Sequence, residues 1–146
     1  MKTYSYFITV ALLFFCCSNA FCQWTYDKKV DAMTDKTTYF AFNKGAEGEL
    51  ELLNKEDDNE VIFSVAKGHF DVYEGWNCRV TIRFDKQPAF TFESRNNVVD
   101  KNFLLFSEPD IINKIKAAKT MLVEVEYYNN KKHLFKFNVS GLKWEH

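Results

Sequence analysis

The sequence predicts a mainly β fold, an antiparallel sandwich or open barrel of about eight short strands with one α-helix near residues 108–119. Most segments after residue 22 alternate apolar and polar residues, which is typical of half-buried strands. One segment instead carries isoleucines at helical spacing. Because this helix falls between two strands, an α+β arrangement is the alternative.

Residues 1–22 have the pattern of a secretion signal. Lys2 supplies the positive charge, and the uncharged run Tyr6–Cys17 is shorter than the roughly 20 residues that a membrane-spanning helix needs. Cleavage after Ala20 or after Cys22 fits the small residues there, and we favour the second. The sequence therefore predicts a secreted or periplasmic protein with one β-rich domain at 23–146.

Lipid attachment to Cys22 is the alternative to plain cleavage. We expect no lipid anchor, because Phe21 is larger than the residues that normally precede a lipidated cysteine. Of the four cysteines, only Cys78 lies outside the signal, so no internal disulfide and no cysteine-based zinc site can form. The residue alternates with apolar neighbours and is expected to be buried.

The composition excludes several classes of protein. Removing Lys2 with the signal leaves 18 Lys and Arg against 20 Asp and Glu, a formal charge of −2. No basic surface is thus expected for nucleic acid, and no membrane-spanning segment for the exported chain. A hydrophobic content of 47% excludes a disordered chain, and five glycines with two prolines disfavour a glycine-rich phosphate loop.

The first four strands are predicted at 37–43, 49–53, 61–66 and 70–73. The first places Phe40 and Phe42 on one face, and the second turns Leu50 and Leu52 inward. A hairpin loop is expected at 44–48, where two glycines lie. An acidic loop is expected at 56–60. Weak calcium binding by this loop is disfavoured, because its spacing does not match an EF-hand.

Three further strands are predicted at 77–85, 89–94 and 102–106. The first of these directs Cys78, Val80, Ile82 and Phe84 to one face. In the second, Phe90 and Phe92 point inward.

The predicted helix is expected to begin with Ser107 as its N-cap, paired reciprocally with Asp110. Pro109 would lie in the first turn, where its missing N–H has little effect. One face carries the apolar residues Ile111, Ile112, Ile115 and Ala118.

The last two strands are predicted to form a hairpin around a three-residue loop at 129–131. This register places Val125 opposite Phe135 and Glu124 opposite Lys136. A two-residue loop is disfavoured, because it would place Glu124 against Phe135.

The sequence predicts no enzyme, no cofactor and no metal site. It contains no Gly-x-Ser-x-Gly, no His-Glu-x-x-His and no phosphate-binding loop. His69 and Asp71 share a strand face, but two ligands do not make a zinc site. His133 is expected to be an inward structural histidine. A hydrolase site built from His69, Asp71 and Asp85 is the least favoured alternative.

Arg79 and Arg83, with Asp85 next along the strand, form the candidate binding row. Two arginines on one strand face can bind a carboxylate or a phosphate bidentately. The alternative is a sheet face whose arginines pair with glutamates of a neighbouring strand.

The order of several short motifs resembles the small periplasmic proteins of the type VI secretion-associated TagO/VasI type and related secreted domains of unknown function. The resemblance covers nearly all of the domain. It rests on Trp24, Met33-Thr34-Asp35, Arg79–Asp85, Ser94, Leu122–Val125 and Phe137–Leu142. The chain departs from those relatives in carrying Leu52 and Leu53 where they usually have a cysteine.

The resemblance implies an envelope location, a β-rich fold and an accessory role in secretion. It also implies that Trp24, Met33, Asp35, Ser94 and Gly141 are structural. We therefore expect a non-enzymatic accessory or binding protein whose partner is an envelope protein or polymer. The alternative is a small periplasmic inhibitor of a lysozyme or protease that presents the acidic loop at 56–60.

Overall fold

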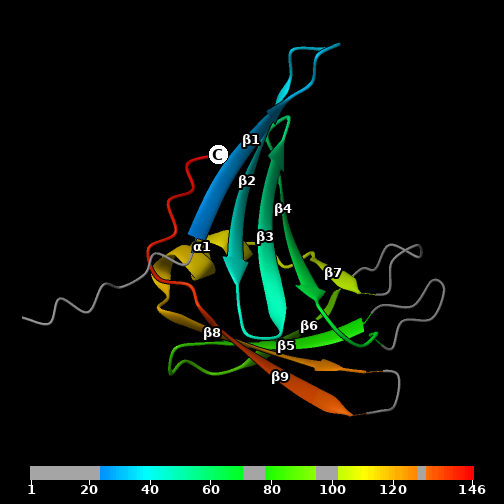
Figure 1. Cartoon of the computed structure of the whole chain (residues 1–146). Coiled ribbons are helices and arrows are strands. Elements are labelled where there is room, and N and C mark those ends of the chain that lie inside the picture. The colour runs from blue at the N-terminus through cyan, green and yellow to red at the C-terminus, as the bar shows by residue number, and fades with distance from the viewer. Residues whose placement is uncertain (1–23, 71–77, 95–101, 128–130) are drawn as a thin grey trace, which may run out of the picture.

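The computed structural model describes residues 24–70, 78–94, 102–127 and 131–146. Within these ranges the chain forms nine strands in two antiparallel sheets and one helix, so the predicted mainly β fold is confirmed (Figure 1). The described strands do not close into a barrel. None of the described helical residues forms a helix long and apolar enough to cross a membrane.

The first sheet has five strands in the order β1-β2-β3-β4-β7. Its first four strands follow one another in the chain as hairpins. They are β1 (Trp24–Val30), β2 (Thr37–Lys44), β3 (Gly48–Lys55) and β4 (Asp58–Val65), and β7 (Phe103–Phe106) pairs with β4.

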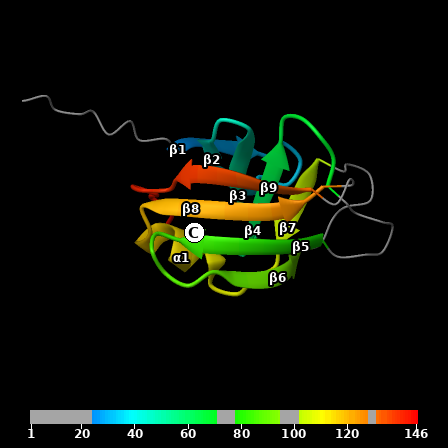
Figure 2. The same cartoon turned by 90° about the horizontal axis from the view of Figure 1, so that it is seen from below.

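The second sheet has four strands in the order β6-β5-β8-β9. They are β5 (Cys78–Phe84), β6 (Phe90–Ser94), β8 (Thr120–Glu126) and β9 (Lys132–Asn138). Its strands run across those of the first sheet (Figure 2), as in the orthogonal class of sheet packing. The helix α1 (Ile111–Ala117) lies between β7 and β8 in the chain.

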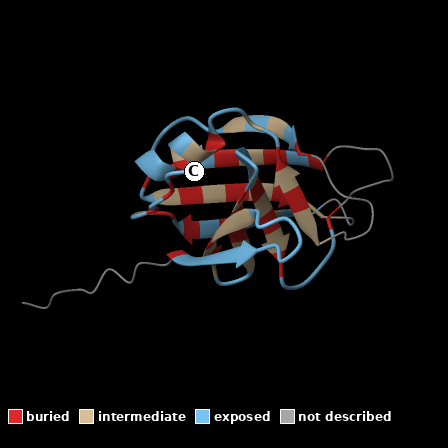
Figure 3. Cartoon of the chain, turned by 90° about the horizontal axis from the view of Figure 1, so that it is seen from above, coloured by how far each residue is buried: buried red, intermediate tan, exposed pale blue. Residues whose placement is uncertain are grey.

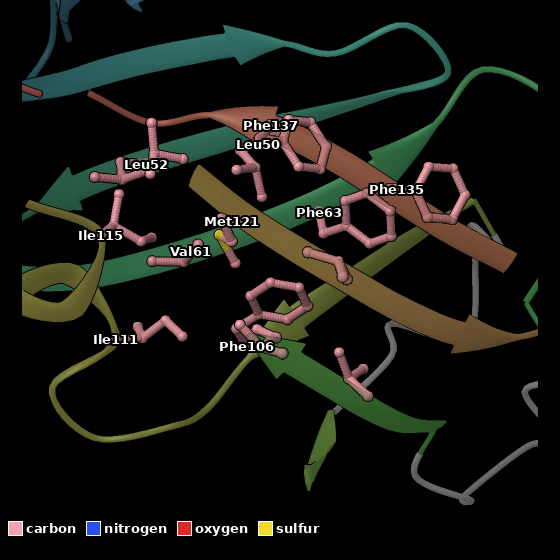
Figure 4. Close-up of a cluster of buried hydrophobic side chains, with 14 of the residues drawn as sticks. Leu50, Leu52, Val61, Phe63, Phe106, Ile111, Ile115, Met121, Phe135 and Phe137 are labelled. Atoms are coloured by element: carbon pink, nitrogen blue, oxygen red, sulfur yellow. The ribbon is translucent and has the colours of Figure 1, made fainter. Parts of the chain in front are cut away.

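The core fills the space between the two sheets. Leu50 and Leu52 of β3 are fully buried, as predicted. Leu50, Leu52 and Phe63 from the first sheet face Met121 and Phe137 from the second, and Ile111 and Ile115 of α1 extend the cluster (Figure 4). Burial alternates along most strands, whereas β1 is exposed beyond Trp24 (Figure 3).

The helix is shorter than predicted. It begins at Ile111, and the N-cap residue Asp110 has a left-handed backbone with φ 67° and makes no side-chain capping hydrogen bond. The predicted cap by Ser107 and the helical placement of Pro109 are therefore wrong. A left-handed residue cannot continue a right-handed helix backward toward residue 108. Ile111 and Ile115 are buried, as their spacing predicts.

The register of the β8–β9 hairpin is shifted by two residues from the prediction. Val125 faces His133, and Glu124 faces Leu134. Because a shift of two keeps every side chain on its face, the predicted inward residues are unchanged. The observed register brings Lys132 Nζ to 2.8 Å from Glu124 Oε1. It also stacks the rings of Tyr127 and His133, whose centroids lie 4.0 Å apart.

The acidic loop predicted at 56–60 is mostly strand. Only Glu56 and Asp57 form the turn, with φ 55° and 66°, and β4 begins at Asp58. Two successive left-handed residues give the twist that a two-residue hairpin needs. Of the strand predicted at 70–73, Phe70 forms an isolated bridge with Tyr127, and the rest lies outside the described residues. Strand β1 was not predicted.

The C-terminal tail packs on Tyr39 of β2 and on Asn59 of β4, close to the β3–β4 turn. Trp144 is buried, and its indole Nε1 donates a hydrogen bond to Asn59 Oδ1 at 3.0 Å. The Lys116 ammonium donates to the Trp144 carbonyl at 2.6 Å, which ties the tail to α1. The His146 ring stacks on Tyr39, with the centroids 3.9 Å apart. Figure 1 shows the tail running beside β1.

Candidate ligand-binding pocket

The predicted binding row lies on the outer face of the second sheet. Arg79 and Arg83 are exposed there. Arg79 pairs in register with Glu93 of β6, and Thr81, between the arginines, pairs with Glu124 of β8. Carboxylates thus flank the arginine row on both neighbouring strands.

Asp85 has a structural partner at the start of β8. Its carboxylate accepts hydrogen bonds from the Thr120 N–H at 2.8 Å, the Thr120 hydroxyl at 3.0 Å and the Lys119 N–H at 3.1 Å. The bond from the Thr120 N–H is the main reason why the pKa of Asp85 lies below its usual value. The carboxylate therefore joins β5 to β8 and does not extend the arginine row.

The residues named by the family resemblance lie far apart. Trp24 is buried and its Nε1 donates to the Val139 carbonyl at 3.1 Å. Ser94 is buried and its hydroxyl donates to the Leu105 carbonyl at 2.7 Å, which links β6 of one sheet to β7 of the other. Asp35 and Gly141 have positive φ, at 54° and 78°. Met33 is 92% exposed at the β1–β2 hairpin tip.

The structure does not bring together His69 and Asp85, two residues of the hydrolase alternative. The His69 Nδ1 lies 2.8 Å from the Asn102 Oδ1, next to the Phe70 bridge to Tyr127. Tyr127 is level with the first residue of β5, whereas Asp85 follows the last, so His69 and Asp85 lie at opposite ends of that strand. Asp71 lies outside the described residues. Within the described part of the chain, no group of three or more His, Cys, Asp or Glu can hold a metal ion.

A pocket of about 470 Å³ lies at the β8–β9 hairpin end of the second sheet. This volume is within the range of about 300–1,000 Å³ that is usual for small-molecule sites. Three segments line it, namely Ala46–Glu47 between β2 and β3, Ala66–Gly68 after β4, and Tyr127, His133 and Phe135 of the last hairpin.

One wall of the pocket is aromatic. Tyr127 and His133 stack almost parallel, at an interplanar angle of 21°, and Phe135 follows, with its centroid 6.4 Å from that of Tyr127. Phe135 in turn packs edge-on against Phe63 in the core, at 5.0 Å. The wall is therefore held by the core, which makes it a preformed surface for a flat apolar group.

The remaining lining includes two residues of opposite charge, Glu47 and Lys67. The Tyr127 hydroxyl donates to the Lys67 carbonyl at 3.3 Å, which fixes the ring against this segment. Burial and, to a smaller extent, the Glu47 carboxylate raise the pKa of Tyr127 above its usual value. The phenol thus stays protonated at neutral pH and keeps its hydrogen bond to the Lys67 carbonyl, and its oxygen can still accept a hydrogen bond.

Gly68 allows the close approach of Tyr127. Its φ is 92°, and a Cβ at this position would lie 2.5 Å from the Tyr127 ring. No other residue fits both requirements without moving the ring.

Sequence reasoning missed the pocket. His133 was predicted to be an inward structural residue, and it is half-buried, with its ring stacked at the pocket wall. Glu47, Lys67 and Tyr127 carry no recognisable motif. The only signal was the concentration of aromatic and charged residues at the ends of strands.

Comparisons with protein-family models, with curated proteins and with solved structures find no match to this chain. The resemblance to the TagO/VasI type therefore stays a prediction.

Proposed function

We propose that the chain is an exported, non-enzymatic binding protein, and that its pocket binds a sugar unit of an envelope polymer. The observation that carries this proposal is the stacked Tyr127–His133 pair in a pocket of about 470 Å³. The sequence supports export through the predicted signal at 1–22. The family resemblance adds an accessory role in a secretion system, which is part of the same proposal.

A sugar ring suits this pocket for two physical reasons. The C–H face of a pyranose is flat and apolar, so it packs on aromatic rings such as those of Tyr127 and His133. Its hydroxyl groups both donate and accept hydrogen bonds. The carboxylate of Glu47 accepts and the ammonium of Lys67 donates, so the two supply complementary partners without a net charge.

The experiment is a pelleting assay with the purified protein and insoluble peptidoglycan, chitin or cellulose. We expect the wild-type protein to pellet with at least one polymer. The double variant Glu47→Gln/His133→Ala should bind about tenfold more weakly, which corresponds to about 1.4 kcal/mol. Glu145→Gln is the matched control, because this exposed carboxylate lies in the tail outside the pocket.

Binding that survives the double variant would contradict the proposed site. Absence of binding to all three polymers would contradict the sugar-binding function itself. Circular dichroism of each variant separates lost binding from lost folding.

The inhibitor alternative is favoured by one other observation. The β1–β2 hairpin extends beyond the body of the molecule (Figure 1), and Met33 at its tip is 92% exposed. A protruding hairpin with one exposed apolar side chain is suited to entering an enzyme cleft. If the chain is an inhibitor, adding the wild-type protein should lower the rate of a lysozyme or a protease, and Met33→Asp should abolish this inhibition. Enzyme activity assays with the two added proteins measure the difference. Unchanged enzyme rates with the wild-type protein would remove this alternative.

A further inference from the structure

The outer face of the first sheet carries an apolar surface that the core does not use. Strand β2 turns Ala41 and Asn43 inward, where both are fully buried, and its two phenylalanines outward. Phe40 and Phe42 therefore share a face, as predicted, and that face is the outer one. If β2 packed only against the core, its phenylalanines would point inward and Ala41 and Asn43 outward, because successive residues of a strand point to opposite faces.

The neighbouring strands continue this surface. The register places Phe42 beside Glu51, Glu51 beside Ile62, and Ile62 beside Leu105. In the next row Phe40 lies beside Leu53. All of these side chains are half-exposed, and none belongs to the core cluster or to the partly buried residues packed against it. We call this surface the Glu51 face, comprising Phe40, Phe42, Glu51, Leu53, Ile62 and Leu105.

Glu51 lies in the middle of this face without a cation. Among the described residues its carboxylate has no ion pair or hydrogen bond. The ammonium of Lys44, two residues along the neighbouring strand, instead lies 3.6 Å from Glu49 Oε2. Burial, with a smaller contribution from Glu49, raises the pKa of Glu51 above its usual value. A carboxylate among apolar side chains is unfavourable until a cation is placed on it.

We propose that the Glu51 face docks a partner protein that presents an apolar surface with a lysine or arginine at its centre. Such a partner removes the five apolar side chains from water and supplies the missing counter-charge. A second copy of this chain, related by a two-fold axis through the face, would instead bring two Glu51 carboxylates together. Charge complementarity therefore selects a cationic partner over a self-complementary dimer.

The test uses two fluorescein-labelled amphipathic peptides with identical apolar faces and either lysine or glutamate at the centre. Their binding to the purified protein is measured by fluorescence anisotropy. We expect the lysine peptide to bind at least about tenfold more tightly than the glutamate peptide. Glu51→Gln should abolish this preference, and Phe42→Ser should weaken both peptides.

The matched controls are Glu126→Gln and Leu134→Ser, which change a glutamate and a 61% exposed leucine of the second sheet. We expect both controls to bind as the wild type does. Equal binding of the two peptides, no binding of either, or unchanged binding by Glu51→Gln would overturn the proposal. Dimerisation in sedimentation that Phe42→Ser removes would assign the face to a second copy instead.

Discussion

At the scale of single residues, two carboxylates respond to folding in opposite directions. The fold raises the pKa of Glu51 mainly by burial, and it lowers the pKa of Asp85 mainly through the Thr120 N–H. Glu51 therefore favours the folded state below its ordinary value of 4.5, and this contribution is lost as the pH rises through the folded pKa. Asp85 favours the folded state above 3.8, and its contribution is lost as the pH falls through the folded pKa.

The pH dependence of Glu51 gives a direct prediction. Glu51→Gln should raise the free energy of unfolding at neutral pH by a few tenths of a kcal/mol, because solvent screens a half-buried group. The difference should shrink below pH 4.5, where the carboxyl is already protonated. Urea unfolding at both pH values measures it. Glu126→Gln on the second sheet is the control, and a Glu51→Gln protein that is less stable at neutral pH would contradict the account.

At the scale of elements, the alternation of apolar residues was enough to locate most strands. The inward faces of the segments around Leu50 and around Val80 follow directly from period-two alternation, and both are buried as expected. Alternation cannot detect a shift of two residues, however, because such a shift leaves every face unchanged. The β8–β9 register was therefore wrong, although its inward residues were right.

The helix start and the first strand were mispredicted for other physical reasons. The left-handed backbone of Asp110 excludes the helical turn that Ser107 and Pro109 suggested. Strand β1 was not predicted because Lys28 interrupts the face that Trp24, Tyr26 and Val30 share, and adjacent charges at 27–29 break the alternation. Edge strands of this kind are identified by pairing with β2 and not by composition.

The C-terminal tail provides the prediction at this scale. Trp144→Ala should lower the free energy of unfolding by about 3–5 kcal/mol, because it removes a buried indole and leaves a cavity. It also removes the hydrogen bond to Asn59. Chemical denaturation followed by circular dichroism measures the loss. Glu145→Ala, at an exposed neighbouring position, should change stability by less than about 0.5 kcal/mol.

At the scale of the whole molecule, the two sheets place candidate surfaces on different sides. The pocket lies where three chain segments meet, and the Glu51 face lies on the outside of the first sheet. Sequence reasoning reached the two-sheet architecture but not these surfaces. The pocket depends on which strand ends meet, and a single sequence contains no direct signal for contacts such as that between Lys67 and Tyr127.

We propose that the Tyr127–His133 pocket binds a sugar. The most direct measurement is a ¹H–¹⁵N NMR titration of the protein with soluble oligosaccharide fragments of peptidoglycan. We expect saturable shift changes concentrated at Glu47, Lys67, Tyr127 and His133, with little change at Arg79 or Glu51. Shift changes centred on the arginine row, or no change at any concentration, would rule out sugar binding in this pocket.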